Sequence, residues 1–407
     1  MRILLVTQYF WPESFIVNEL VQRLVARGHS VTVVTGKPNY PTGQIHPPYT
    51  RHGIQCERYE GASVIRVPCR PRHKASALDL SLNYMSFVFS GLLRFPWLLR
   101  GRDVDVILVF TTPITAAIPA ILLRRLKRCH LALWVQDLWP DVVKSTGFAG
   151  SRLVSRGLRL VSDFVYGAGD TVFVQSEKFV RPISETISSD RIFVLPNFAA
   201  SYVSEEIVPL PIHIQRLFCG RFSVVFAGNL GRAQALTTIV EAARVLQSRP
   251  EILIIVAGTG SDAESLRRAA ADAGINNLAM VGMLDNRMMP ELFRLADCLL
   301  VTLGRDAALN ATIPSKVQAY LKAGRPIVGA ISGAAADLIE KSGAGLTVEA
   351  EDAAGLARSI LELTDMPFKK RLQMGEAGQA YYKEHFEAEH VIGRLLRVLE
   401  SRMGGHA

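Results

Sequence analysis

The stretch VVFAGNLGRAQ, residues 224–234, lies just past the middle of the 407-residue chain. Its apolar run ends abruptly at Gly228, where polar residues and a second glycine follow, and apolar residues then recur at helical spacing from Leu236 to Leu246. This pattern predicts a buried strand, a tight loop and a helix start. Free N–H groups at a helix start carry partial positive charge, and Arg232 adds forked donors, so the loop would suit a diphosphate. A plain tight turn remains the alternative.

Similar apolar runs recur along the whole chain. In the first half they occupy residues 3–7, 31–35, 64–67, 106–110, 131–135, 171–174 and 192–195. In the second half they occupy residues 223–227, 252–257, 278–282, 298–302, 326–329 and 346–349. Continuous Val, Ile and Leu runs are typical of strands buried on both faces, and therefore of parallel sheets covered by helices. We predict an α/β fold of two Rossmann-like, doubly wound parallel-sheet domains facing a central cleft. Ligands are expected beyond the carboxyl ends of the strands.

The series of strands pauses between residues 197 and 221, where two prolines and mixed polarity indicate a linker. The chain is also too long for one ordinary core. We therefore predict a first domain over residues 1–199 and a second over residues 200–385. A last helix within residues 386–407 is expected to pack back on the first domain.

Composition narrows the possible partners. The formal net charge of +9 suggests an anionic partner, although a generally basic surface is the alternative. The five cysteines are scattered and odd in number, which argues against a disulfide framework or zinc site and fits a reducing compartment. The N-terminus has a very short apolar run and no cleavage site typical of a signal peptide. The sequence shows neither an aromatic platform nor a recognition helix, so we do not expect a nucleic-acid partner.

Two stretches raise the question of a membrane. Residues 106–123 contain no charge, but Pro113 and Pro119 break the run, so a strand, a turn and a helix are expected rather than a span. Residues 82–102 mix aromatic residues, Leu and Arg. A surface helix at a membrane interface and a packed core helix both fit this second stretch.

Further loops of the second domain also follow strands. Gly258 and Gly260 would allow a turn tight against a ligand; they match G-x-G-x-x-A only weakly as a dinucleotide signature, because no strand-end acid follows at the expected distance. The first strand of the chain has no such glycines, which argues against a nicotinamide enzyme. Lys316 at a helix start is electrostatically unfavourable unless an anion binds there, with a solvated lysine as the alternative.

Two patterns resemble metal sites, but we expect neither of them to bind a metal. Asp103 and Asp105 form an Asp-x-Asp pattern, but they precede a strand and so would face the wrong end of the sheet. His385 and His390 are five residues apart, which is poor spacing for one helical face.

The motifs of the second half, in their order, resemble those of family 4 glycosyltransferases with the GT-B fold: AGNLGRAQ, VAGTG, VGML, ADCLLVTL and PSKVQAYLKAGRPIV. The stretches QYFWPESFIVNEL, RGHSVTVVTGKPNYPTGQI, LNYMSF and WVQDLWPD resemble the WbuB-like transferases of bacterial O-antigen and capsule synthesis. The resemblance covers nearly all of the chain. It implies metal-independent transfer of a sugar, with retention of configuration and no cofactor. The implied donor is a UDP-sugar, typically an N-acetylated deoxyhexosamine such as N-acetyl-fucosamine, and the implied acceptor is a polyprenyl-diphosphate-linked saccharide.

The resemblance and the loop positions together assign roles to individual residues. The donor diphosphate is assigned to Gly228, Asn229, Arg232, Gln234, Ser315 and Lys316. The nucleotide is assigned to Gly258, Gly260, Gly282, Met283, Leu284 and Gln318. The acceptor side is assigned to Glu13, Asn39 and Tyr40. Asp137 or Asp141 would polarise the acceptor hydroxyl, with capping of a turn or helix as the alternative.

One departure from the family pattern leaves other functions open. The wider family carries two glutamates eight residues apart, and Ala311 and Ala319 occupy those places. Gln318 is adjacent and could hydrogen-bond a ribose. A non-catalytic partner subunit and a UDP-sugar 2-epimerase therefore remain alternatives.

Basic residues of the first domain suit anionic head groups, and we expect a protein peripherally associated with the cytoplasmic face of the inner membrane. These residues are Arg70, Arg72, His73, Lys74, Arg94, Arg100 and Arg102.

Overall fold

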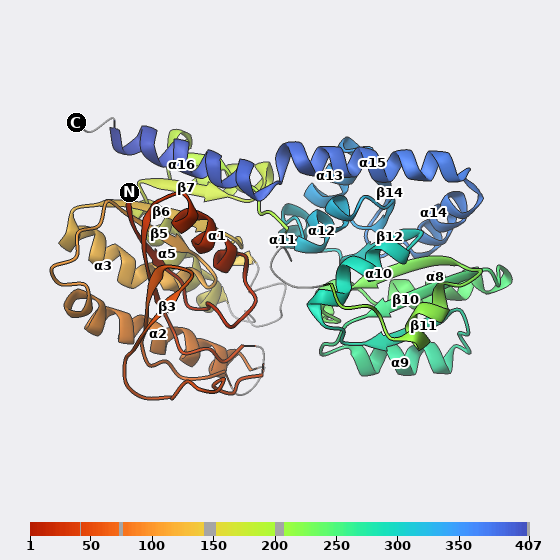
Figure 1. The fold of residues 1–407 in the computed structure, drawn as a ribbon, viewed down its shortest axis with the longest axis horizontal. Helices are drawn as coiled ribbons and strands as arrows, with labels where there is room; N and C mark the ends of the chain where they lie inside the picture. The colour runs from red at the N-terminus through yellow and green to blue at the C-terminus, as the bar shows by residue number, and fades with distance from the viewer. Residues whose placement is uncertain (41, 73–75, 142–151, 200–206, 405–407) are drawn as a thin grey trace. The chain divides into compact units, whose positions relative to one another are not determined.

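The computed structural model describes residues 1–40, 42–72, 76–141, 152–199 and 207–404. The chain forms two compact units (Figure 1). One comprises Met1–Pro196 together with the segment that begins at Ala388, and the other comprises Asn197–Glu387. The sequence predicted boundaries a few residues away, after residues 199 and 385. His73 and Lys74, two of the basic residues singled out above, lie outside the described residues.

The first unit is built on an eight-stranded sheet in the order β3-β4-β2-β1-β5-β6-β7-β8. Its strands are β1 (Arg2–Val6), β2 (Ser30–Thr35), β3 (Gln55–Tyr59), β4 (Ala62–Arg66), β5 (Val106–Phe110), β6 (His130–Val135), β7 (Thr171–Val174) and β8 (Ile192–Val194). All neighbouring strands pair in parallel except β3 with β4. The sheet is therefore parallel, as predicted, except at one edge, where β3 runs antiparallel to β4.

The helices of the first unit fall into two groups of neighbours. Helix α1 (Ile16–Ala26) packs against α16 (Ala388–Gly404), whereas α3 (Ala117–Lys127) packs against both α2 (Ala77–Leu98) and α5 (Arg152–Ala168). A short helix, α6 (Val180–Ser184), precedes β8.

The local sequence explains two segments of this unit, and the second of them, residues 106–123, forms the strand, turn and helix that the sequence predicted. Helix α1 buries a stripe that includes Leu20 and Leu24, and the chain leaves it at Gly28, whose φ of 81° is a conformation that glycine tolerates best. Residues 106–123 form β5, a short turn of 3₁₀ helix and α3. Among the described helices, none is long and apolar enough to cross a bilayer.

The second unit is built on a six-stranded, wholly parallel sheet in the order β11-β10-β9-β12-β13-β14. Its strands are β9 (Phe222–Ala227), β10 (Ile252–Ala257), β11 (Leu278–Gly282), β12 (Cys298–Thr302), β13 (Ile327–Ala330) and β14 (Gly345–Val348). Every residue of β9, β10 and β12 is buried, as the apolar runs predicted.

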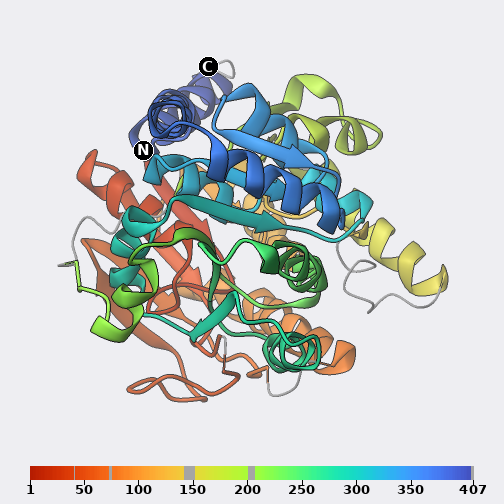
Figure 2. The ribbon, with the colours of Figure 1, turned by 90° about the vertical axis from the view of Figure 1, so that its right-hand side faces the viewer.

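Helices cover both faces of this second sheet (Figures 1 and 2). One face packs against α8 (Thr237–Val245), α9 (Ala263–Asp272) and α14 (Ala353–Asp365). The other face packs against α10 (Met289–Leu295), α12 (Ser315–Ala323), α13 (Ala334–Lys341) and α15 (Phe368–His385). The shorter helices are α7 (Ile212–Gln215), inside the predicted linker, and α11 (Ala307–Ala311). Each unit is thus a doubly wound α/β domain.

Candidate active site

The loop after β9 lies directly against the loop after β10. The N–H of Gly228 donates to the carbonyl of Ala257 at 2.9 Å, and the N–H of Leu230 donates to the carbonyl of Thr259 at 2.8 Å. A Cβ atom on Gly258 would lie 1.8 Å from the Gly228 oxygen, and one on Gly260 would lie 2.4 Å from the Leu230 oxygen. These two glycines are therefore required by the contact between the loops. Their contact with a nucleotide, which the sequence predicts, remains a prediction.

Arg232 lies beyond this contact, in a turn of 3₁₀ helix (Arg232–Gln234) that separates the loop from α8. The sequence predicted a helix directly after the loop, so this turn is an addition to the prediction. The Arg232 side chain is exposed, as is that of Asn229. Within the described part of the chain, no hydrogen bond or ion pair engages the Arg232 guanidinium, so its donors are available to a ligand.

Lys316 lies in the first turn of α12, and its side chain reaches back to the β9 loop. Its Nζ donates to Oε1 of Gln234 at 2.5 Å and lies 3.7 Å from the centroid of the Phe226 ring. A Cβ atom on Gly228 would lie 3.5 Å from the same Nζ. Among the described residues, no carboxylate forms an ion pair with this ammonium. The Lys316 side chain is half-buried and bonded to Gln234 rather than extended into solvent, which argues against the solvated alternative left open by the sequence.

Burial lowers the pKa of Lys316 to about 7. Removing an ammonium from water disfavours its charged form, and here no nearby anion compensates. A diphosphate beside Nζ would supply that anion and restore the charged form. The structure thus brings Gly228, Gln234 and Lys316 together, as the sequence predicted for a diphosphate site.

Other side chains fix the geometry of this loop, and the sequence did not single them out. The Tyr320 hydroxyl, from α12, accepts from the N–H of Ala227 at 3.0 Å, and Thr302 Oγ1 at the end of β12 donates to the carbonyl of Gln234 at 2.5 Å. Both residues are fully buried. Their apolar surroundings give no sequence signal that distinguishes them from ordinary core residues.

The remaining residues assigned to the nucleotide or its diphosphate lie at or just after the end of β11 and on α12. Gly282, with a φ of 76°, accepts from the N–H of Gly258 at 2.7 Å, so the end of β11 adjoins the two loops. Met283 is exposed and Leu284 packs partly against the core. Ser315 is exposed at the start of α12.

Gln318 is fully buried in α12, and neither atom of its amide has a hydrogen-bond partner among the described residues. Ala319 is half-buried against the core, and Ala311 is buried. The structure therefore does not place a carboxylate where the wider family has its glutamates. A buried amide without partners is costly, and a ribose contact for Gln318 remains a prediction.

In the first unit, Glu13 joins two backbone segments, at residue 10 and residues 39–40, at the carboxyl edge of the sheet. Its Oε1 accepts from the N–H groups of Asn39 at 2.8 Å and Tyr40 at 2.7 Å, and its Oε2 accepts from Phe10 at 3.1 Å. Burial raises the pKa of Glu13, and the three N–H donors oppose that shift. This carboxylate holds the loops in place, so the three residues assigned to the acceptor side do lie together.

Aromatic rings surround this point. The exposed Tyr40 ring lies 5.8 Å from that of Tyr9 and 5.5 Å from that of Phe15, measured between centroids. Asn39 is buried, and its side chain bonds to the backbone of Lys37 and Arg72. Tyr40 is thus the exposed member of the group.

A polar network joins β1 to α2 at the same edge. Asn83 accepts from Gln8 Nε2 at 2.7 Å and from the Tyr9 hydroxyl at 3.1 Å. The next residue of α2, Tyr84, lies 6.3 Å from Trp139, measured between ring centroids. The sequence did not identify Gln8, Asn83 or Tyr84 as site residues.

Asp137 and Asp141 follow β6 but differ in surroundings. Burial raises the pKa of Asp137 to about 6, a value suited to a general base near neutral pH. No hydrogen bond to its carboxylate is found in the described ranges, so the alternative of a capping role for Asp137 gains no support. Asp141 is exposed and lines a pocket of about 280 Å³ with Trp139 and Tyr166. Residues 142–151 lie outside the described residues.

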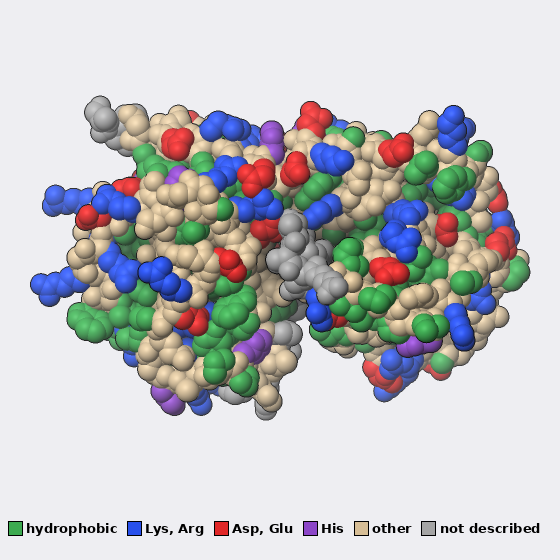
Figure 3. Space-filling model, viewed as in Figure 1, with side chains coloured by type: hydrophobic (Ala, Val, Ile, Leu, Met, Phe, Trp, Pro, Cys, Tyr) green, Lys and Arg blue, Asp and Glu red, His purple; other side chains and the backbone are tan. Residues whose placement is uncertain are grey.

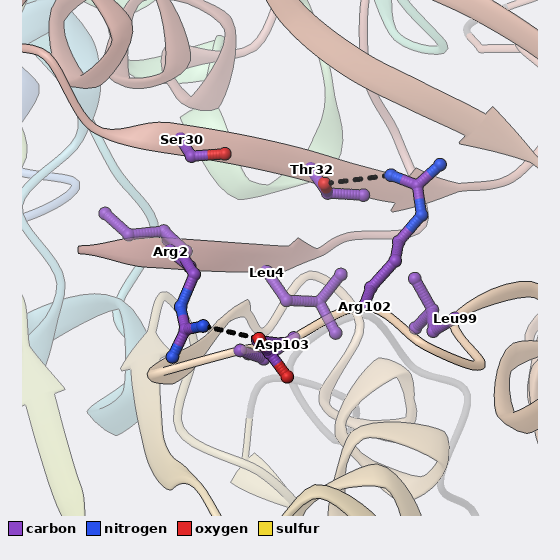
Figure 4. Close-up of a pocket in the computed structure, with 9 residues that line it drawn as sticks. Arg2, Leu4, Ser30, Thr32, Leu99, Arg102 and Asp103 are labelled. Carbon is purple, nitrogen blue, oxygen red and sulfur yellow. Dashed lines mark hydrogen bonds and ion pairs between the residues drawn. The ribbon is translucent and has the colours of Figure 1, made fainter.

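The Asp-x-Asp pattern lies at the opposite edge of the first sheet, as the sequence predicted. Arg2 forms ion pairs with Asp103 at 2.8 Å and with Asp105 at 2.5 Å. Figure 4 shows Arg2 pointing toward Asp103 across a small pocket that Thr32 and Arg102 also line. These carboxylates are therefore engaged in holding the start of β1.

Comparison with known proteins follows the division into two units. A family model described as "Glycosyl transferase 4-like domain" matches residues 15–197, and one described as "Glycosyl transferases group 1" matches residues 214–381. The chain is 26% identical over 317 residues to a protein of Escherichia coli K12 assigned to colanic acid biosynthesis as the glycosyl transferase WcaI; the match covers 75% of this chain and 76% of that protein.

A second relative matches a shorter part. It is a GDP-mannose-dependent monoacylated alpha-(1-6)-phosphatidylinositol monomannoside mannosyltransferase of Corynebacterium glutamicum, 29% identical over 161 residues, or 39% of this chain and 41% of that protein.

Solved structures share the whole fold. Sucrose-phosphate synthase from Thermosynechococcus elongatus has a TM-score of 0.74 at 18% identity, over 98% of this chain and 99% of that one. Anabaena Alr3699/HepE, solved with UDP and glucose, has a TM-score of 0.67 at 15% identity, over 98% and 100% of the two chains.

Two doubly wound domains with these neighbours define the GT-B class of glycosyltransferases. The chain belongs to the family 4 glycosyltransferases, since a 4-like domain and a group 1 domain together account for most of its length.

Proposed function

We propose that this glycosyltransferase moves a sugar from a UDP-linked donor to a lipid-linked saccharide in the synthesis of a bacterial surface polysaccharide, with retention of configuration. The similarity to WcaI, assigned to colanic acid biosynthesis, supports the polysaccharide role. The observation that carries the proposal is the half-buried Lys316 ammonium, which lies beside the glycine loop after β9 without an anionic partner among the described residues.

The donor's leaving group explains why this arrangement would be catalytic. The bond between the sugar's anomeric carbon and the phosphate oxygen breaks, and its electron pair stays on the diphosphate. Lys316, Arg232 and the N–H groups at the start of α12 would stabilise that growing charge, because fixed dipoles and cations need no reorganisation during the reaction. Gln234 holds the Lys316 ammonium in position before the donor binds.

The acceptor hydroxyl forms the new bond to the anomeric carbon and loses its proton. Asp137 is the base we propose, because its pKa of about 6 leaves it ionised at neutral pH but still able to take a proton. Tyr40 and Tyr84 offer aromatic faces for the acceptor saccharide at the same edge of the first sheet. Metal ions and other cofactors have no part in this proposal.

The donor and the cellular site are inferred from family likeness. A UDP-linked N-acetylated deoxyhexosamine, such as N-acetyl-fucosamine, is the donor that the WbuB-like resemblance favours. GDP-mannose is the competing donor, because the Corynebacterium glutamicum relative depends on it. We also propose peripheral association with the cytoplasmic face of the inner membrane, where a polyprenyl-diphosphate acceptor would be held.

One assay tests the proposal and its two alternatives. The purified chain is incubated with a panel of UDP-sugars and GDP-mannose, together with a short polyprenyl-diphosphate-linked saccharide, and the products are analysed by mass spectrometry and NMR. Transfer of an N-acetylated deoxyhexosamine from UDP with an unchanged anomeric configuration is expected. A free epimer of the donor sugar would indicate a 2-epimerase. Absence of turnover by the folded chain with every donor would favour a non-catalytic partner subunit.

A further inference from the structure

Helix α2 carries a continuous stripe of exposed apolar side chains. The exposed fractions are 71% for Leu78, 40% for Leu82, 39% for Met85, 60% for Phe89, 75% for Leu93 and 70% for Trp97. Successive members are three or four residues apart, which places them along one face of the helix. In Figure 3, hydrophobic side chains are visible at the lower left, over the position of α2 in Figure 1.

The stripe is not the face that folds the helix into the protein. Phe87, Val88 and Phe95 are buried and form that inner face, and α3 packs closely enough that a Cβ atom on Gly91 would lie 2.8 Å from Pro119. A second apolar face of this length is unusual on a soluble surface, and exposed apolar patches commonly mark an interaction site.

The charges around the stripe indicate what covers it. Helix α2 contains two charged residues: Asp79, which is buried and paired with Arg70 at 2.9 Å, and Arg94. Beyond its end lie the exposed residues Arg100 and Arg102. The neighbouring α3 has no acidic residue, and its last turn adds Arg125 and Lys127, whereas Arg124 of the same turn is ion-paired with Asp170. An apolar face beside a basic rim complements an anionic lipid surface.

We propose that the α2 stripe lies in the interface of an anionic bilayer, with the basic rim on the lipid head groups. This proposal rests on the proposed function, because a lipid-linked acceptor is held in the membrane and the enzyme must bind there to reach it. Trp97 lies at the end of the stripe nearest the arginines, and tryptophan favours the head-group level of a membrane.

The same helix connects this surface to the acceptor edge of the sheet. Asn83, near the amino end of α2, bonds to Gln8 and Tyr9 just after β1, and Tyr84 adjoins Trp139. A lipid-linked saccharide anchored along α2 would therefore reach the Tyr84 edge while its chain stays in the bilayer.

Vesicle partitioning tests the surface directly, without any substrate. The variant Phe89→Gln/Leu93→Gln/Trp97→Gln is compared with the matched control Phe368→Gln/Leu372→Gln, which replaces exposed apolar residues of α15. We expect the triple variant to bind phosphatidylglycerol vesicles at least about tenfold more weakly than the wild type, and the control to bind unchanged. Arg100→Gln and Arg102→Gln should each weaken binding about fivefold at low salt. Equal binding by the triple variant and the wild type would overturn the proposal.

A second measurement does not depend on disruptive substitutions. Lipids carrying a bromine or spin-label quencher near the head group should quench the fluorescence of the wild type, and Trp97→Phe should lose most of that lipid-dependent quenching. Unchanged quenching in Trp97→Phe would contradict insertion at this point. If light scattering instead shows that the triple variant turns a dimer into a monomer, the stripe binds a second copy of the chain and the lipid proposal is wrong.

The outcomes separate this proposal from the proposed function. If the chain binds vesicles through α2 but transfers no sugar, the docking surface is supported and the proposed function is contradicted. If the chain transfers sugar to a short, water-soluble acceptor but does not bind vesicles, the proposed function is supported and the docking surface is contradicted.

Discussion

Folding moves the Lys316 ammonium partly out of water and places it beside an amide oxygen and an aromatic ring. The side-chain amide oxygen Oε1 of Gln234 lies 2.5 Å from Nζ, and the Phe226 ring centroid lies 3.7 Å away. Neither partner carries a charge, so the pKa falls to about 7. An anionic ligand would be stabilised here more strongly than at an exposed lysine, because the ammonium has already lost part of its hydration.

Replacing this ammonium should weaken the donor site without unfolding the unit. We expect Lys316→Met, which keeps the length of the side chain, to reduce UDP affinity about 10- to 100-fold, the loss typical of a hydrogen bond to a charged group. Isothermal titration calorimetry measures the change. Lys341→Met, at an exposed lysine of α13, is the control and should bind UDP like the wild type. Equal affinities for the two variants would exclude Lys316 from the site.

The pH dependence of transfer should reveal two groups. Asp137 is active when ionised, so the rate should rise as the pH increases through about 6. Lys316 is active when protonated, so kcat/KM for the donor should fall as the pH increases through about 7. In kcat the falling limb should move to higher pH, because bound diphosphate stabilises the ammonium. Asp137→Asn should remove the rising limb, and a rising limb that persists in this variant would exclude Asp137 as the base.

For single residues, the sequence predicts those whose polar or glycine character stands out at a strand end or helix start. Gly228, Gln234 and Lys316 follow strand ends or start a helix, and the structure brings them together. Phe226 was not predicted, because it reads as one more apolar residue of a buried strand. Asn83 was not predicted either, because its partners Gln8 and Tyr9 are more than 70 residues away in sequence and meet it only through the fold.

Between elements, the two loops after β9 and β10 pack backbone against backbone. Gly258 has a φ of 147°, and a Cβ atom there would lie 1.8 Å from the Gly228 oxygen. The position of Gly228 beside Lys316 therefore depends on a glycine in the neighbouring loop. The contact between the two loops is by itself enough to require glycine at Gly258, whose G-x-G spacing resembles a dinucleotide signature.

We expect Gly258→Ala to lower the free energy of unfolding by about 2–4 kcal/mol, through steric overlap and backbone strain. Gly274→Ala is the matched control: Gly274 has a φ of 62°, but a Cβ atom there would have open space. The control should lose only about 1 kcal/mol, the cost of the left-handed conformation. Denaturant unfolding measures both. Equal losses would mean that the loop contact is not tight.

Strands were predictable where both of their faces are buried. The runs in β5, β9, β10 and β12 are continuous because each side chain meets a helix or a neighbouring strand. Strand β3 was missed because its residues are half-buried or exposed, and its sequence QCERY contains no apolar run. An antiparallel edge strand of this kind is specified by its pairing with β4 rather than by its own composition.

At the scale of the whole molecule, the chain ends in the unit where it begins. Helix α16 buries Val391, Leu395 and Leu399, and its Glu389 forms ion pairs with Arg23 and Arg27 of α1. The sequence predicted a last helix that packs back on the first domain. Its docking partner α1 is more than 360 residues away along the chain, and no local pattern identifies α1 as that partner.

The apolar face of α16 should matter more to stability than its ion pairs. We expect Leu395→Ala to cost about 2–5 kcal/mol in the free energy of unfolding of the first unit, as for a buried leucine elsewhere. Glu389→Gln should cost about 1 kcal/mol or less, because its carboxylate is exposed to solvent. Thermal unfolding by calorimetry compares them. A larger loss for Glu389→Gln would mean that charge, not packing, holds the helix.

The most direct test of the donor site is a crystal structure of the chain with UDP bound. We expect the diphosphate oxygens within hydrogen-bond distance of Lys316 Nζ and the Arg232 guanidinium, above the loop that follows β9. Nucleotide density elsewhere in the molecule, or density at this loop with Lys316 still bonded only to Gln234, would contradict the account.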